Sequence, residues 1–428
     1  MLPTISPVCL SMVCTISCWC TPSHGHALVQ QACWQLPEDH ARTVLGGLLP
    51  SMLAVVTFSL GTMVAAFSSA SSGATPRAAA IVMRDPGAHR AIASFLAAFI
   101  YAIVAKVALA LQFYGPVGRF VLLLGTLVVL AYLIVRLVLW VRSLTRLGRL
   151  SDTLEKTADV ADKALARYVE DPWMGSQPGP ADRALGVLIH PDRAGYLVAV
   201  DFESLQRQAE QTGKVIHVLT RPGQFVAPSI PVAHIEGQDC EVDGPALAEI
   251  LDAFVVSSWR SLDDDPRYAV VVMSEIAQRA LSPAINDPGT AIQTATAMAA
   301  LLVRRFPRSP RESATNNSKG ESSTVRYPDV TVIPLDEAGL VRDAFDPIAR
   351  DGAAVFEVHC RLQKLLAVVH ADCSEPLAAS ARKVASRALK RSLAALQLEE
   401  ERDELMNLHR ASFADEDGPG ARQEASNR

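Results

Sequence analysis

Three apolar stretches follow one another in the first third of this 428-residue chain. An α-helix needs about 20 apolar residues to cross the hydrocarbon core of a bilayer. The sequence therefore predicts an integral membrane α-helical region within residues 42–150, with about three transmembrane helices. We expect these spans at about residues 48–69, 91–113 and 120–141.

Lys106 in the second stretch and Arg136 in the third are the intramembrane charges of this prediction. Ionisable residues inside a span often mark an ion or substrate path. Alternatively, a long side chain near the end of a span extends its charge to the headgroups. Arg136 lies about one turn from the inner end of its span and Lys106 about two turns from the outer end, so this extension is easier for Arg136.

The positive charges of the short loops predict the orientation of the chain. Lys and Arg in such loops are retained on the cytoplasmic side. Arginines occur both between the first two stretches and directly after the third, namely Arg77, Arg84, Arg90, Arg142, Arg146 and Arg149. We therefore expect a multi-pass protein of the cell inner membrane with a cytoplasmic C-terminal part, and the lipid bilayer as its first partner.

The first apolar stretch is rich in glycine, alanine, serine and threonine. Small residues let helix backbones approach closely in lipid. We expect this span to lie between neighbouring helices. Those neighbours belong either to the same chain or to a homo-oligomer, in which the span would contact a second copy or line a pore.

Residues 1–41 are harder to assign. Five of the eight cysteines precede residue 34, and Pro3 and Pro7 interrupt an uncharged start that lacks the basic region of a signal peptide. Cys18 and Cys20 are too close together for a CxxC metal site, and we predict no metal here. The segment is either a degenerate span or a start placed too early.

Beyond residue 150 the pattern changes to that of a water-soluble α+β domain. We expect a stalk helix and linker over 151–175 and a small β domain over 180–240, with a hairpin turn at Pro222 and Gly223. Within this domain the segment ESLQRQAEQTG is expected to form a short helix that ends at Gly213. Residues 241–413 predict a helical cytoplasmic domain with a mobile loop at 307–329, followed by a disordered tail at 414–428. Its helices are expected at about 266–281, 288–305, 336–370 and 375–413.

A polar cluster at the break between the first two of these helices is the best local candidate for ligand binding. It comprises Ser282, Asn286, Asp287 and Thr290. Asp287 followed by Pro288 is typical of a helix start, where free backbone N–H groups can bind an anion. A capped helix–helix corner is the structural alternative. Arg221 and Arg279 would add positive charge if the fold brought them near.

Motifs of the common enzyme classes are missing from the sequence. It contains no GxxxxGK[ST], HExxH or GxSxG sequence. His359 with Cys360 and His370 with Cys373 lie too far apart on one predicted helix to hold a single ion. The formal net charge of -5 argues against nucleic acid as a partner. We therefore predict no catalytic residue and no cofactor.

Several segments resemble a known family. They include TFSLGTMVAAFSSASSGATPRAAAIVMRD, AGYLVAVD, RPGQFV and, most specifically, ALSPAINDPGTAIQ. These resemble the bacterial predicted-membrane-protein family catalogued as domain of unknown function 2254, over roughly residues 42 to 400. The resemblance implies several spans with a cytoplasmic tail and names no activity. It also implies a first span and an extracytoplasmic loop upstream, where this chain has its cysteine-rich segment.

The function predicted from these features is that of a membrane-anchored scaffold or sensor. Its cytoplasmic domain would bind a small molecule or protein partner that the sequence does not specify. An oligomeric channel or transporter subunit is the alternative, because of the small-residue first span and Lys106. A membrane-bound enzyme comes third.

Overall fold

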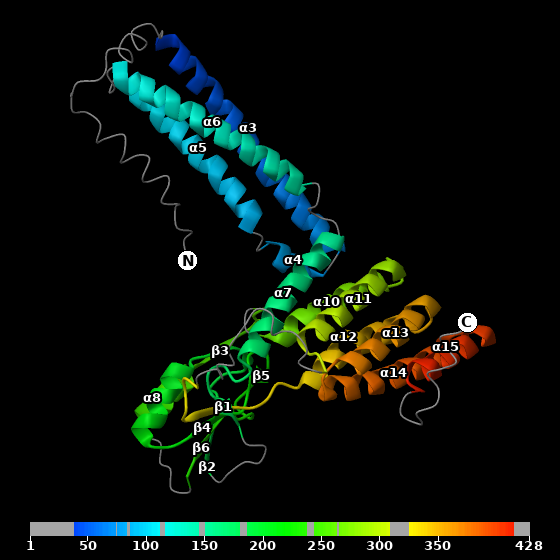
Figure 1. The fold of residues 1–428 in the computed structure, drawn as a ribbon. Coiled ribbons are helices and arrows are strands. Elements are labelled where there is room, and N and C mark those ends of the chain that lie inside the picture. The colour runs from blue at the N-terminus through cyan, green and yellow to red at the C-terminus, as the bar shows by residue number, and fades with distance from the viewer. Residues whose placement is uncertain are drawn as a thin grey trace. The chain divides into compact units, whose positions relative to one another are not determined.

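The structure of the chain is a computed structural model, which describes residues 38–73, 75–83, 86–111, 116–144, 150–179, 186–237, 244–262, 265–308 and 325–414. Nearly all of the N-terminal segment 1–41, most of the loop 307–329 and the tail from residue 415 lie outside these residues. The described chain divides into two compact units (Figure 1). Residues 75–81 belong with the chain after residue 150, although they precede two of the apolar helices.

The first unit contains α3 (Glu38–Gly73), α5 (Pro86–Ala110) and α6 (Pro116–Leu144), which pack against one another. Aromatic rings fill part of the interface between these helices. Trp140 of α6 is only 3% exposed, and its ring meets Phe58 of α3 and Phe95 of α5 edge-on at centroid distances of 6.2 Å. Edge-to-face pairs of this kind add to the energy of apolar burial.

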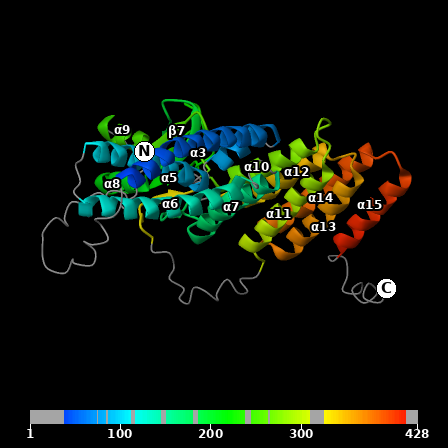
Figure 2. The ribbon, with the colours of Figure 1, turned by 90° about the horizontal axis from the view of Figure 1, so that it is seen from above.

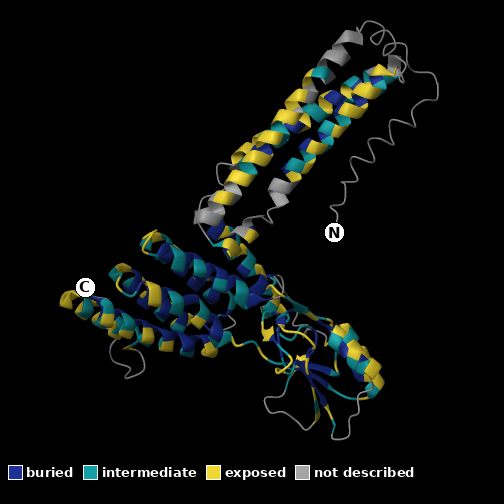
Figure 3. Cartoon of the chain, turned by 180° about the vertical axis from the view of Figure 1, so that it is seen from behind, coloured by how far each residue is buried: buried dark blue, intermediate teal, exposed yellow. Residues whose placement is uncertain are grey.

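Two of the described helices are long and apolar enough to cross a membrane, which confirms part of the prediction. They are the segments Arg90–Ala110 of α5 and Phe120–Arg142 of α6. In α3 the corresponding apolar segment, Leu53–Ala65, is shorter than a bilayer crossing. The first predicted span, at about residues 48–69, is therefore not established. Large apolar residues are exposed on all three helices, and Figure 3 shows exposed positions along each of them.

The small residues of α3 do not lie where we expected them within one chain. Ser59 is fully buried, whereas Ser51, Ala54, Thr57 and Gly61 are exposed. A Cβ atom at Gly61 would meet no other atom within 4 Å. The bulky Val55 and Val56 contribute to the contact with α5 and α6 instead. The described helices thus leave the small-residue surface of α3 open.

The second unit is built around a bundle of helices. The short α4 (Pro76–Met83) joins α7 (Leu150–Glu170), α10 (Pro266–Ala280) and α11 (Pro288–Arg305) in one apolar core. Leu154, Ala161 and Leu165 bury one side of α7 in this core. The predicted stalk helix is therefore an integral part of the bundle, because its apolar stripe packs against α10 and α11.

The C-terminal half of the bundle has more helices than predicted. The expected helix over 336–370 is broken into α12 (Glu337–Asp351) and α13 (Phe356–Asp372), with Gly352 at the break. The expected helix over 375–413 divides into α14 (Glu375–Ala395) and α15 (Glu399–Ser412). The second break lets α15 turn back onto α13 and bury Leu405 completely. Figure 2 shows α11 to α15 side by side.

The β part of the second unit contains two described sheets. One has the strand order β1-β8-β4-β6-β2 and the other β5-β3-β7. The strands are β1 (Gln177–Pro178), β2 (Gly186–Ile189), β3 (Gly195–Val200), β4 (Ile216–Val218), β5 (Phe225–Val226), β6 (Ala233–Glu236), β7 (Phe254–Ser257) and β8 (Val330–Val332). Strand β8 pairs in parallel with β4, so a segment that follows α11 completes the sheet. The sheets therefore extend beyond the predicted range of 180–240.

Two shorter helices complete the β part. Helix α8 (Phe202–Thr212) ends at Gly213, as predicted, in the left-handed conformation with φ +64°. Helix α9 (Gly244–Asp252) precedes β7. The turn at Pro222 and Gly223 does not close the expected hairpin. It carries the chain from β4 in one sheet to β5 in the other, while β4 pairs with β6.

Candidate functional site

The four polar residues predicted from the sequence do come together, at the corner between α10 and α11. The Asp287 carboxylate accepts hydrogen bonds from the backbone N–H of Thr290 at 3.0 Å and from its hydroxyl at 2.6 Å. These bonds to Thr290 hold the pKa of Asp287 below its ordinary value. Asp287 is thus the N-cap of α11, and it uses both carboxylate oxygens within its own helix.

Ser282 and Asn286 shape the rest of the corner. The Ser282 hydroxyl donates to the carbonyl of Arg279 at 2.6 Å, and the backbone N–H of Asn286 donates to the carbonyl of Ser282 at 2.9 Å. Asn286 has φ +50°, a left-handed conformation that asparagine tolerates better than most residues. The corner is formed by local bonds, which is how a capped helix–helix connection is built. Ligand binding here stays a prediction.

Arg221 does not supply charge to this corner. Its guanidinium donates to the carbonyl of Ile333 at 2.7 Å and to that of Pro172 at 2.9 Å. It also lies over the ring of Tyr168, 5.5 Å from the ring centroid. The side chain is buried, and this burial lowers the pKa of Arg221. Arg221 therefore joins the end of α7 to the β part of the unit.

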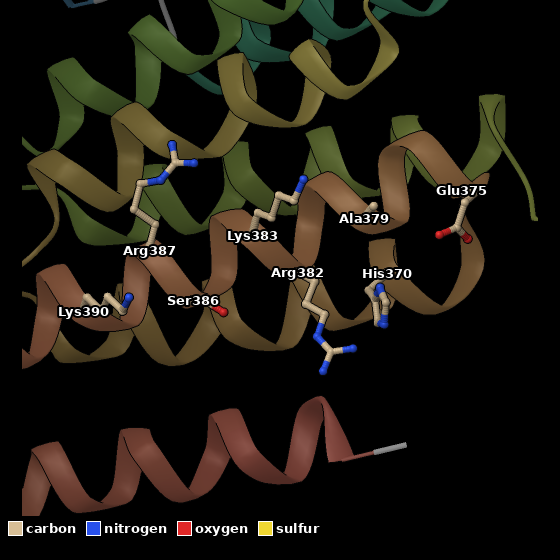
Figure 4. Close-up of a pocket in the computed structure, with 8 residues that line it drawn as sticks. All are labelled: His370, Glu375, Ala379, Arg382, Lys383, Ser386, Arg387 and Lys390. Atoms are coloured by element: carbon tan, nitrogen blue, oxygen red, sulfur yellow. The ribbon is translucent and has the colours of Figure 1, made fainter. Parts of the chain in front are cut away.

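A basic groove lies along α13 and α14 of the second unit. It is lined by His370, Glu375, Ala379, Arg382, Lys383, Ser386, Arg387 and Lys390 and encloses a hollow of about 600 Å³ (Figure 4). All of these residues except His370 belong to α14. The volume falls in the range of small-molecule sites, but the lining is charged where such sites are mostly apolar.

Two of the basic groups in the groove are already engaged. Arg387 pairs with Asp346 of α12, a carboxylate that Arg391 also approaches at 3.4 Å. Arg382 also interacts with a neighbour. Lys383 and Lys390 are exposed and have no ion-pair partner among the described residues. These two ammonium groups are therefore available to a ligand.

This groove was not predicted from the sequence, although the sequence carries a signal for it. Lys383, Arg387 and Lys390 recur at spacings of four and three residues, which places them on one side of a helix. A charged stripe of this kind is also typical of any solvated helix surface. Only the folded bundle shows that α13 and α14 together make a hollow beside it.

Lys106 and Arg136, the two charges that the sequence predicts inside the membrane, lie in the C-terminal parts of α5 and α6. Lys106 is exposed and stands about one turn before Ala110, where α5 ends. Arg136 is half-buried, and its Nε atom has no hydrogen-bond partner among the described residues. The early end of α5 shortens the distance that the Lys106 side chain must extend to reach headgroups.

The family described as "Predicted membrane protein (DUF2254)" matches residues 1–368. The chain belongs to this family. The match confirms the resemblance inferred from the motifs, with a range that begins before residue 42 and ends before residue 400. The family description makes the chain a predicted membrane protein and assigns no activity.

Two curated relatives share a shorter region with this family member. They are Uncharacterized protein Mb1321c of Mycobacterium bovis and Uncharacterized protein Rv1290c of Mycobacterium tuberculosis. Each is 31% identical over 147 residues, which cover 34% of this chain and 26% of the relative. The chain thus spans about a quarter of the length of these relatives. No solved structure matches the chain.

Proposed function

We propose that the chain is a multi-pass inner-membrane protein that serves as a membrane-anchored sensor or scaffold, with its second unit in the cytoplasm. The observation that carries this proposal is the position of α4. This helix lies in the chain between the apolar helices α3 and α5, yet it packs in the core of the second unit. Because the chain runs directly from α3 through α4 to α5, a conformational change in that core would be transmitted through the backbone to the adjoining ends of α3 and α5.

Several contacts hold α4 in this core. Ala78 is 0% exposed and Ile81 5% exposed, both within the apolar cluster of α7 and α10. Arg77 forms an ion pair with Glu275 of α10, and the Thr75 hydroxyl accepts a hydrogen bond from the backbone N–H of Ala78 at 3.2 Å. Burial raises the pKa of Glu275, while the charge of Arg77 opposes this shift. The buried apolar side chains and this partly exposed ion pair together attach α4 to the core of the second unit.

The shared core also constrains the topology. Residues 75–81 precede α5, and the chain from residue 150 follows α6, yet both belong to one compact unit. If α5 and α6 cross the bilayer, they must do so as a hairpin with both ends on the same side. The arginines in the loops before α5 and after α6 favour the cytoplasmic side.

Reporter fusions test the orientation. We expect green fluorescent protein fused after Arg428 to fluoresce, and alkaline phosphatase at the same position to be inactive. The same pair of reporters in the connection between α5 and α6 should give the opposite result. An active phosphatase after Arg428 would refute the cytoplasmic assignment.

The role of α4 is tested by replacing each of two alanines of this helix with aspartate, one buried and one exposed. Ala78→Asp places a charge in the core, whereas Ala80→Asp changes an exposed position of the same helix. We expect only Ala78→Asp to lower the stability of the second unit, by about 2 kcal/mol or more, since an unpaired buried carboxylate is costly. Equal thermal unfolding of the two variants in detergent would contradict the anchoring by α4.

An oligomeric channel or transporter subunit is the second candidate, and the open small-residue surface of α3 favours it. Such a surface admits a neighbouring helix at close range, and Lys106 is exposed on α5. Ion flux into liposomes that contain the full chain tests this candidate. Flux that falls with Lys106→Ala would support a channel, while the absence of flux would leave the anchored sensor.

Ligand binding at the corner of Ser282, Asn286, Asp287 and Thr290 remains a further possibility for the sensor. Thr290→Val removes one hydroxyl and leaves the backbone N–H that Asp287 accepts. A small-molecule screen by thermal shift, run on the full chain and on this variant, tests the site. A ligand that stabilises the wild-type chain but not the variant would support binding at the corner.

A further inference from the structure

We propose that the basic groove on α13 and α14 binds a soluble small molecule that carries several phosphate groups in line. This inference deepens the proposed function, on which it rests, by naming the ligand class that the cytoplasmic sensor would bind. It is carried by the spacing of the basic side chains, by their pairing and by the form of the hollow.

The spacing sets the length of the ligand. Lys383 and Lys390 lie seven residues apart on α14, which corresponds to about 10 Å along the helix axis. Arg387 lies between them on the same side. A chain of phosphates of similar length can contact both ammonium groups with the lysine side chains extended, whereas a single phosphate contacts both only if the two side chains bend toward each other. The hydroxyl of Ser386, which also lines the groove, can donate to a phosphate oxygen.

The ion pairs already present around the groove determine which basic side chains are available to bind the ligand. Asp346 neutralises Arg387 from the side of α12, and Glu375 lies 3.8 Å from Arg308. The only acidic residue of the lining is therefore already paired. The excess positive charge that remains is that of Lys383 and Lys390, which have no ion-pair partner among the described residues.

The form of the hollow favours an anion over an apolar ligand. Its walls are mainly basic and polar side chains, and Figure 4 shows Lys383, Arg387 and Lys390 along one stretch of α14. Charged hydrogen bonds from Lys to phosphate oxygens are stronger than bonds between neutral groups. An apolar molecule would instead leave these charges without compensation.

Calorimetric titration of the full chain with inorganic tripolyphosphate tests the proposal. The chain is held in nanodiscs of phosphatidylcholine, which has no net charge. We expect saturable binding, and a loss of affinity of at least about tenfold in the double variant Lys383→Gln, Lys390→Gln, because two charged contacts are removed. Lys163→Gln, an exposed lysine of α7 outside the groove, should bind as the wild type does.

One further variant and two further ligands test the role of charge and of ligand length. The double variant Lys383→Arg, Lys390→Arg keeps both charges and should retain binding. Orthophosphate and sulfate, titrated at the same ionic strength, should bind more weakly because neither spans the groove. Equal affinity for sulfate and tripolyphosphate, or equal affinity of the wild type and the glutamine variant, would overturn the proposal.

A membrane surface is the other source of closely spaced phosphates, and a lipid arm distinguishes it. The titration is repeated in nanodiscs that contain phosphatidylglycerol. We expect the affinity for tripolyphosphate to stay the same. A decrease that disappears in the glutamine variant would assign the groove to lipid headgroups and refute a soluble ligand. The reporter fusions are independent of this test, so a chain with correct orientation and no binding would refute the ligand class alone.

Discussion

The α-carbon of Gly223 lies directly against the carboxylate of Asp265, so close that a Cβ atom at residue 223 would overlap that carboxylate. Gly223 also has φ +94°, a conformation that residues with a side chain rarely adopt. Asp265 is 3% exposed and caps α10 by accepting from the backbone N–H of Tyr268 at 3.0 Å. This contact joins the turn after β4 to the first turn of a core helix.

Gly223→Ala is therefore expected to destabilise the second unit by about 2–3 kcal/mol, because both the overlap and the positive φ act against a methyl group. Thermal unfolding of the full chain in detergent, followed by circular dichroism, measures the effect. Gly213→Ala is the matched control, since Gly213 has φ +64° but open space around its α-carbon. It should cost only about 1 kcal/mol. If the two variants lost the same amount of stability, the contact with Asp265 would be unimportant.

Arg221 connects three segments through one buried guanidinium, which bonds two backbone carbonyls and covers Tyr168. Arg221→Ala should lower the free energy of unfolding by about 3 kcal/mol, because it removes a buried side chain and takes away the donor of two half-buried carbonyls. Arg221→Lys should recover less than half of this loss, since one ammonium group cannot reproduce the planar fork. Full recovery by lysine in the same unfolding measurement would contradict a geometric role.

The sequence predicted those elements whose signals are local. Asp287 with Pro288 predicted the start of α11, and Gly213 the end of α8, because caps act within one turn. The apolar segments in α5 and α6 followed from length and composition alone. The polar corner could also be located in advance, since its four residues lie within nine positions of the chain.

Features that depend on distant segments could not be predicted in this way. Strand β8 reaches the sheet from beyond α11, and only its pairing with β4 reveals that it belongs there. Ala78 and Ile81 follow an apolar helix, and nothing in their neighbours indicates that they enter a core formed after residue 150. The basic groove likewise needs α13 beside α14.

Asp287→Ala is expected to destabilise the second unit by about 1 kcal/mol, the usual cost of a lost helix cap. The pKa of Asp287 is lowered by its bonds to Thr290, so the folded chain binds a proton less readily than the unfolded chain. The stabilisation is thus present above the ordinary pKa of aspartate and lost as the pH falls below it. Asp192→Ala, an exposed aspartate outside the helices, serves as the control. An unchanged melting temperature with loss of ligand binding would instead favour a functional role for Asp287.

His359 should make the stability of the bundle depend on pH. The side chain is fully buried on α13, where its Nε2 lies 3.2 Å from the carbonyl of Ala349, and burial lowers the pKa of His359 to about 4. In the unfolded chain the imidazole has its ordinary pKa near 6.5, so between these values the unfolded state binds more protons. The neutral folded form is therefore fully favoured above pH 6.5, and stability falls progressively as the pH is lowered toward 4.

The lowered pKa of His359 corresponds to a decrease in the free energy of unfolding of roughly 3 kcal/mol at most between pH 7 and pH 4. Thermal unfolding of the full chain at a series of pH values measures it. His359→Gln should be less stable than the wild type at pH 7, because it changes a packed core position, and should show a smaller dependence on pH below 6.5. His190→Gln, which replaces an exposed histidine after β2, should keep the wild-type dependence. If His359→Gln retains the full dependence, protonation of His359 is not its cause, and other groups of the bundle must titrate in this range.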